Sequence, residues 1–144
     1  MLGENLEDFL EATLSSSEGE WASTDTVAKY LGIKLHSAYV SVRKLSEMGF
    51  IKTKDKAAKI ALTEIGLKLA NAVTGKHDLI KRFLTNFLCV PEGVADEDAH
   101  HMEHIISDES LEKILQFFEF VEKDPDDFMK WFSKYKTFVC KVKV

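Results

Sequence analysis

Cysteine, proline and long apolar runs are all scarce in this chain of 144 residues. Its two cysteines, Cys89 and Cys140, lie far apart and outside any Cys-x-x-Cys pattern, so we expect free thiols in a reducing compartment rather than a disulfide. No apolar run approaches the roughly 18 residues that a membrane helix needs, and no basic and apolar leader opens the chain. Together these absences predict a soluble cytoplasmic protein with no membrane partner.

Positive charge is missing from the first part of the chain and concentrated in the next. Residues 1–25 contain seven acidic residues and no Lys or Arg, whereas residues 26–62 contain eight basic and two acidic residues. The formal net charge of the whole chain is -5. A basic segment within an acidic molecule indicates a local surface for phosphate groups, which makes nucleic acid a candidate partner.

The first half of the sequence has the pattern of a helix-turn-helix followed by a hairpin. Apolar residues recur at helical spacing near 4–16, 24–31 and 35–48, which predicts three helices. Two short strands are predicted at 50–53 and 59–62. Two short helices around a tight turn that contains glycine are typical of a helix-turn-helix. The two strands, with a basic tip between them, predict a two-stranded wing.

The outward side of the third predicted helix is polar apart from Val40. Arg43 and Lys44 can contact base edges or phosphates, and Val40 suits a thymine methyl group. Lysines of the wing could lie along the phosphate backbone. A solvated helix face and an exposed hairpin kept soluble by lysines are the alternatives. The candidate DNA-binding residues are His36, Ser37, Val40, Ser41, Arg43, Lys44, Lys54 and Lys56.

The second half of the chain is predicted to be helical. Helices are expected over 63–88, over 94–106, after Ser107 and from Pro125, and residues 139–144 alternate like a strand. The aromatic residues Phe117, Phe118 and Phe120 give one helix an apolar face that either packs in a core or binds a second copy of the chain.

The predicted fold class is therefore mainly α, with two domains. Residues 1–72 would form a winged helix-turn-helix of three helices plus a two-stranded wing. Residues 73–144 would form an all-helical domain. We expect no enzymatic activity from this organisation, and a homodimer from the aromatic helix face.

A cluster of metal-ligand residue types lies in this second half. His100, Glu103 and His104 share one face of a helix, because residues three and four apart are neighbours. Imidazole and carboxylate groups together suit Zn, Fe, Mn or Ni. Three ligands do not complete a metal site. Asp8 and Glu11, which lie three residues apart on the first predicted helix, are carboxylates that could supply the further ligands. A solvated polar face rich in histidine, and a generic acidic face, are the competing interpretations.

These motifs together resemble the metal-dependent repressors of the diphtheria toxin repressor family, and most of all the short manganese transport regulator branch. The resemblance covers about residues 5–122 and rests on the segments at 6–11, 75–79 and 102–108. It implies that Asp8, Glu11, His77, Glu103 and His104 are metal ligands. His100 departs from the family, since the short branch has Glu there and the iron branch has Cys.

The resemblance further implies that the metal is a corepressor for a homodimer on a palindromic operator in double-stranded DNA. Hard oxygen ligands suit Mn(II) and mixed imidazole sites suit Fe(II), so Fe(II) is slightly favoured over Mn(II). The regulated genes would serve metal uptake or homeostasis.

Two other functions fit parts of the pattern. The spacing His-x-x-Glu-His also matches inverted zinc hydrolases, in which the Glu is a general base, but no other feature indicates a substrate cleft. A winged-helix regulator without metal, sensing a small molecule or oxidation of Cys89, is the second alternative.

Overall fold

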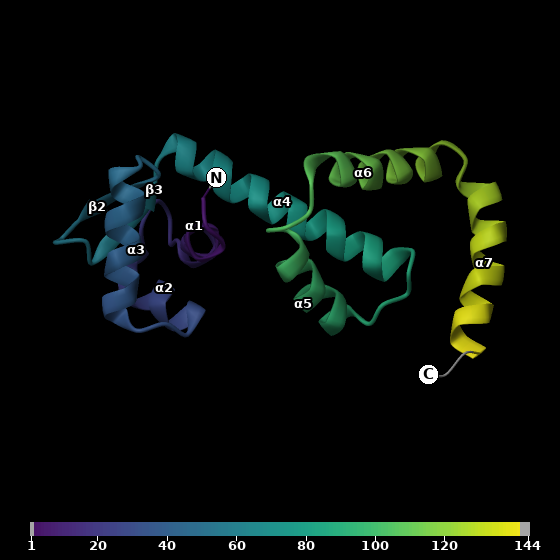
Figure 1. The fold of residues 1–144 in the computed structure, drawn as a ribbon, viewed down its shortest axis with the longest axis horizontal. Helices are drawn as coiled ribbons and strands as arrows, with labels where there is room; N and C mark the ends of the chain where they lie inside the picture. Colours follow the sequence, from purple (N-terminus) through teal and green to yellow (C-terminus); the bar gives the residue numbers. More distant parts are fainter. Residues whose placement is uncertain (1, 142–144) are drawn as a thin grey trace. The chain divides into compact units, whose positions relative to one another are not determined.

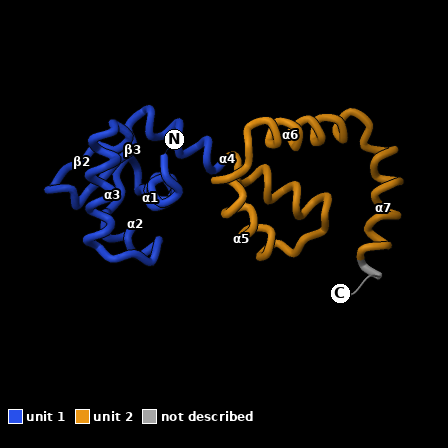
Figure 2. The backbone as a smooth tube through the Cα atoms, in the orientation of Figure 1, with its two compact units in different colours: residues 1–74 blue, residues 75–144 orange. Residues whose placement is uncertain are grey.

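The computed structural model describes the backbone of residues 2–141 (Figure 1). It divides into two compact units, Met1–Thr74 and Gly75–Val144, which are coloured separately in Figure 2. The boundary between them falls inside helix α4, Glu64–Asn86. None of the helices in the described part of the chain is both long and apolar enough to cross a membrane.

Three helices form most of the first unit, as the apolar spacing predicted. They are α1 (Glu4–Ser16), α2 (Thr24–Leu31) and α3 (Leu35–Glu47). Gly32 ends α2 in the left-handed conformation, with φ of 65°, which a residue without a Cβ adopts at little cost. The side chains of Phe9, Leu10 and Leu45 are completely buried. The three helices therefore share one apolar core.

The sheet of the first unit has three strands rather than the two that were predicted. Its strands are β1 (Ala22–Ser23), β2 (Ile51–Lys54) and β3 (Lys59–Leu62), in the antiparallel order β1-β3-β2. Ala22 pairs with Ile60, and Ile51 pairs with Leu62. A strand of two residues is too short to show the alternation that identifies strands in a sequence, so β1 escaped the prediction.

The tip of the β2–β3 hairpin is built from three consecutive residues with positive φ. Asp55, Lys56 and Ala57 have φ angles of 53°, 55° and 63°. Asp adopts this region more readily than most residues. The carbonyl oxygen of Ala57 accepts a hydrogen bond of 2.6 Å from the Thr24 hydroxyl, which fastens the tip to the start of α2.

Helix α4 begins with a close backbone approach to the residues just before β2. The Thr63 hydroxyl donates to the Gly49 carbonyl at 2.6 Å and accepts from the Gly66 N–H at 3.1 Å. A Cβ atom on Gly66 would lie 2.0 Å from the carbonyl oxygen of Phe50. Glycine is therefore required here by space, and Gly75, further along α4, has no neighbouring atom within 4 Å of such a position.

The second unit contains the rest of α4 and three further helices. These are α5 (Glu92–Met102), α6 (Asp108–Lys123) and α7 (Pro125–Lys141). Ser107 caps α6, as expected, by accepting a hydrogen bond of 3.1 Å from the Ser110 N–H. The expected strand over 139–144 is wrong for residues 139–141, which continue α7, and residues 142–144 lie outside the described residues.

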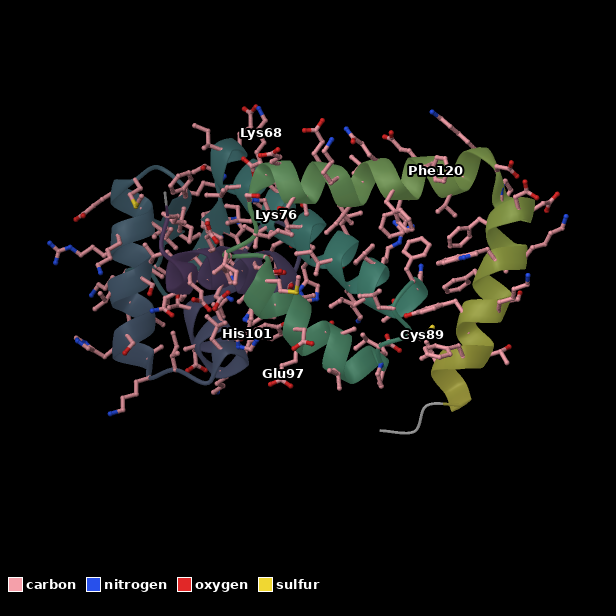
Figure 3. All side chains as sticks on the ribbon, turned by 45° about the vertical axis from the view of Figure 1, so that its right-hand side comes forward. Lys68, Lys76, Cys89, Glu97, His101 and Phe120 are labelled. Carbon is pink, nitrogen blue, oxygen red and sulfur yellow. The ribbon has the colours of Figure 1, made fainter. Side chains whose placement is uncertain are left out.

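Aromatic rings from α4, α6 and α7 gather in the second unit. The ring of Phe87 packs edge to face against Phe117 and Phe118, with centroids 4.8 and 4.9 Å away. Phe118 is buried, whereas Phe120 on α6 (Figure 3) is 67% exposed and Trp131 on α7 is 62% exposed. The predicted aromatic face thus serves partly as a core and remains partly open.

Candidate metal centre and nucleic-acid interface

The three residues of the His-x-x-Glu-His pattern lie at the end of α5. His100 belongs to the helix, Glu103 is its C-cap with φ of -58°, and His104 lies in the turn that follows. The expected helix over 94–106 is therefore wrong at its end, and the three residues do not share one helix face. Their ligand atoms nevertheless lie within 4.8 Å of one another.

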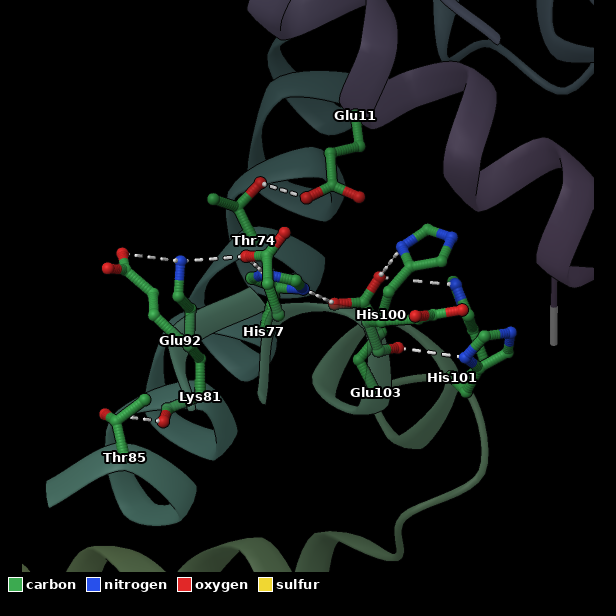
Figure 4. Close-up of polar contacts among 12 residues, drawn as sticks. Glu11, Thr74, His77, Lys81, Thr85, Glu92, His100, His101 and Glu103 are labelled. Carbon is green, nitrogen blue, oxygen red and sulfur yellow. Dashed lines mark hydrogen bonds and ion pairs between the residues drawn. The ribbon is translucent and has the colours of Figure 1, made fainter. Parts of the chain in front are cut away.

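The Glu103 carboxylate is the centre of this cluster (Figure 4). Its Oε1 atom lies 3.4 Å from His100 Nδ1 and 3.3 Å from His104 Nε2, and its Oε2 atom lies 2.9 Å from Nδ1 of His77 on α4. Only 3% of Glu103 is exposed. A buried carboxylate surrounded by three imidazoles supplies the nitrogen and oxygen ligands that first-row divalent metals bind. The donor set of the second unit therefore fits a divalent cation.

The second ring nitrogen of His77 contacts another carboxylate. Its Nε2 atom lies 3.1 Å from Oδ1 of Asp96, which also lies 2.9 Å from Nζ of Lys81. Burial lowers the pKa of His77, but the hydrogen bond to Asp96 and the charges of Glu103 and Asp96 outweigh it, so the pKa lies above its ordinary value. Hydrogen bonds from Lys81 and His77 lower the pKa of Asp96. Neither Asp96 nor Lys81 was among the predicted site residues.

The acidic candidates Asp8 and Glu11 lie on α1 in the first unit. Oε1 of Glu11 accepts a hydrogen bond of 3.3 Å from the Thr74 hydroxyl, and both residues are half-buried. Their contribution to the ligand set stays a prediction.

His101, the remaining histidine of α5, is turned toward its own helix. Its Nδ1 atom lies 2.9 Å from the carbonyl oxygen of Glu97, one turn earlier, and the side chain is exposed (Figures 3 and 4). It therefore provides a natural comparison with the clustered histidines.

Helix α3 has the two faces that the sequence predicted. Ala38, Val42 and Leu45 are buried, whereas Val40 remains 41% exposed among polar neighbours. The other candidates on this helix are exposed or, at Ser41, half-buried; they are His36, Ser37, Ser41, Arg43 and Lys44. Arg43 Nε forms an ion pair of 3.2 Å with Glu47, which is exposed and of low strength, so the guanidinium can exchange it for a phosphate.

The wing presents its lysines beside a tryptophan that sequence reasoning did not single out. Nζ of Lys54 lies 4.2 Å from the ring centroid of Trp21, and Lys52 forms an ion pair with Glu20. Lys56, at the tip of the hairpin, is exposed. Trp21 directly precedes β1. Because β1 was not predicted from the sequence, the position of Trp21 beside the wing could not be predicted either.

Comparison with known proteins places both halves of the chain in one family. Residues 1–58 match the model described as iron dependent repressor, N-terminal DNA binding domain, and residues 63–131 match its metal binding and dimerisation domain. An uncharacterized HTH-type transcriptional regulator of Methanocaldococcus jannaschii is 33% identical over 120 residues, which cover 82% of this chain and 95% of that protein. MntR of Salmonella typhimurium is 31% identical over 116 residues, covering 79% and 72%.

Solved structures have the same fold. A manganese-dependent transcriptional repressor in complex with manganese is 28% identical with a TM-score of 0.68, covering 76% of this chain and 50% of that chain. T. acidophilum IdeR, 23% identical, has a TM-score of 0.69 and is covered over 55% of its length. The present chain thus spans about half the length of these two repressors. The resemblance seen in the sequence is confirmed, and the chain belongs to the iron-dependent repressor family of metal-dependent transcriptional regulators.

Proposed function

We propose that this chain is a repressor of metal-homeostasis genes for which Fe(II) or Mn(II) is the corepressor. The observation that carries the proposal is the convergence of His77, His100 and His104 on the buried Glu103 carboxylate. Three imidazoles with one carboxylate slightly favour Fe(II) over Mn(II). The bound cation would supply the positive charge that stabilises a buried carboxylate.

The protein residues have separate parts in this function. Glu103 and the three imidazoles bind the metal, and we propose from the family resemblance that Asp8 and Glu11 complete the ligand set. The exposed face of α3 and the lysines of the wing contact double-stranded DNA, with base contacts from α3 and phosphate contacts from the wing. Metal affinity and DNA affinity would then be coupled, and such coupling is reciprocal.

The second unit supports a homodimer, for which we propose a palindromic operator. The matched family domain is a dimerisation domain, and exposed aromatic residues on α6 and α7 offer apolar surface for a second copy. Two-fold symmetry of such a dimer is matched by a palindromic site, with half-sites about 34 Å apart on the DNA.

Calorimetric titration with Mn(II), and with Fe(II) under anaerobic conditions, tests the metal site. The double variant Glu103→Ala, His104→Ala should lose at least about two orders of magnitude in affinity, because metal ligands are removed and not merely their supports. His101→Ala is the matched control, since His101 contacts its own helix. Unchanged affinity in the double variant would show that the metal binds elsewhere.

A mobility-shift titration on the protein's own promoter, at fixed salt, tests the regulatory part. Specific affinity should rise when Fe(II) or Mn(II) replaces a chelator, while non-specific binding follows the salt concentration alone. Arg43→Ala and Lys44→Ala should weaken DNA binding and leave metal affinity intact. Asp8→Ala should weaken only the metal-dependent part. Equal specific affinity in all three conditions would overturn the corepressor function and favour a regulator that senses a small molecule or thiol oxidation.

A further inference from the structure

Two residues outside the metal-ligand set form a polar chain that ends on His77. They are Asp96 on α5 and Lys81 on α4, and the ion pairs that join them to each other and to His77 lie within the second unit. We propose that Asp96, held in place by Lys81, is a positioning residue that keeps Nδ1 of His77 available as a metal ligand. This inference rests on the proposed metal site.

The geometry at His77 distinguishes its two ring nitrogens. Nδ1 lies 2.9 Å from Glu103 Oε2, on the side of the ligand cluster (Figure 4). Nε2, the other nitrogen of the ring, lies 3.1 Å from Asp96 Oδ1. A neutral imidazole has one N–H donor and one acceptor nitrogen, and a carboxylate only accepts. When Nε2 carries the proton and donates a hydrogen bond to Asp96, the lone pair of Nδ1 points toward the cluster.

This arrangement has the form of a carboxylate–histidine–metal triad. In such triads, the nitrogen that does not bind metal donates its N–H to a carboxylate, which fixes the tautomer and the ring orientation. The side chain of His77 is only 16% exposed, so water has little access to replace Asp96. Without Asp96, the carboxylate that remains beside the ring in the described chain is Glu103. The N–H would then lie on Nδ1, the nitrogen that must bind the metal.

Lys81 holds the Asp96 carboxylate in position beside His77. Its Nζ atom lies 2.9 Å from Asp96 Oδ1 and 3.5 Å from Glu92 Oε1. His77 and Lys81 are four residues apart on α4, and Glu92 and Asp96 are four apart on α5, so each pair shares a helix face. The imidazole and the ammonium group on α4 therefore face the two carboxylates on α5.

Metal affinity of Asp96 variants is the first measurement, with Mn(II) as the probe in calorimetry. Asp96→Ala should lower the affinity by roughly 10- to 100-fold, the usual effect of removing an outer partner of a ligand histidine. Asp96→Asn retains an oxygen acceptor and should recover part of that loss. Lys81→Gln should have a smaller effect than Asp96→Ala. Asp98→Asn on the same helix is the matched control and should bind as the parent does.

The tautomer of His77 is the second measurement, made by nitrogen-15 NMR on the metal-free protein at a pH above the imidazole titration. The parent should carry its proton mainly on Nε2. In Asp96→Ala, the Nδ1–H form should increase, because Glu103 is then the remaining carboxylate acceptor. A merely structural role for Asp96 would not move this ratio. An Nδ1–H majority in the parent, or an unchanged ratio in Asp96→Ala, would overturn the inference.

The outcome for the metal site itself is separable. If Glu103→Ala, His104→Ala loses metal while Asp96→Ala binds like the parent, the positioning role is wrong and the proposed function stands. If that double variant binds metal normally, the proposed function fails first. Circular dichroism checks that each variant has the same helicity as the parent, so that a loss of metal affinity is not caused by unfolding.

Discussion

The two units of this protein differ in how they use their apolar side chains. In the first unit, the residues of α1, α2, α3 and the sheet bury one another in a continuous core that includes Phe9, Val27 and Ile60. In the second unit, rings such as Phe118 are buried while Phe120 and Trp131 stay exposed. The first unit therefore has a continuous buried core, although apolar residues such as Tyr30 and Ile65 are exposed on it. The second unit leaves a group of aromatic rings on α6 and α7 partly exposed, and this surface suits a second copy of the chain.

The largest expected effect comes from opening the closed core of the first unit. Phe9→Ala should lower the free energy of unfolding by about 3–5 kcal/mol, because it removes a buried ring and leaves a cavity. Tyr30→Ala, at an exposed aromatic residue of the same unit, should change it by less than about 0.5 kcal/mol. Denaturant unfolding followed by circular dichroism measures both. Equal losses in the two variants would contradict the contrast between core and surface.

The next effect concerns the open surface of the second unit. Phe120→Ser should weaken dimer association by about 2 kcal/mol, or roughly thirtyfold, if this ring is an anchor of the interface. Sedimentation equilibrium across a range of protein concentrations measures the change. Tyr30→Ser is the matched control, since that ring is equally exposed in the first unit. A parent protein that stays monomeric at tens of micromolar, with and without metal, would exclude the dimer.

Helix α4 contains two glycines, Gly66 in the first unit and Gly75 at the start of the second unit. Gly66→Ala should destabilise the protein by about 1–3 kcal/mol, since the new methyl group collides with the Phe50 carbonyl. Gly75→Ala meets no atom and should stabilise it by about 0.4–1 kcal/mol through lower entropy of the unfolded chain. Thermal unfolding monitored by circular dichroism gives both signs. A stabilised Gly66→Ala variant would disprove the close approach.

The smallest expected effect distinguishes lysines within the wing. Lys56→Ala should make the slope of log affinity against log salt shallower by about 1, as one phosphate contact is lost. Lys52→Ala should change the slope less, because Glu20 already pairs with that lysine. Fluorescence anisotropy of labelled non-specific DNA at several salt concentrations separates them. The same slope change for both would mean that the Glu20 pair does not hold in solution.

Local patterns explain why much of the fold could be predicted. Amphipathic spacing identified the helices of the first unit, and Gly32 and Ser107 were recognisable as helix ends because their conformations depend on neighbouring residues. The strand β1 and the contact of Gly66 with Phe50 could not be predicted, since both depend on segments that meet only in the folded chain. Helix α7 was predicted as shorter, because its last residues alternate in polarity.

The cluster of candidate metal ligands was predicted from residue types, but its geometry was not. Glu103 and His104 leave α5 yet still meet His100, because the turn after the helix returns their side chains to the cluster. Asp96 and Lys81 carried no motif of their own. The spacing of four residues in both α4 and α5 was the available signal, and it becomes informative only once the two helices are known to pack together.

At the left-handed wing tip, folding and the proposed phosphate contact of Lys56 favour different residues. Holding a lysine at φ of 55° costs about 1–2 kcal/mol relative to glycine, so Lys56 is not the residue that folding alone would select. A laboratory selection for heat resistance should replace Lys56 with Gly or Asn, whereas a selection for tight repression should retain it. The hairpin tip is thus a place where the two selections would drive the sequence in opposite directions.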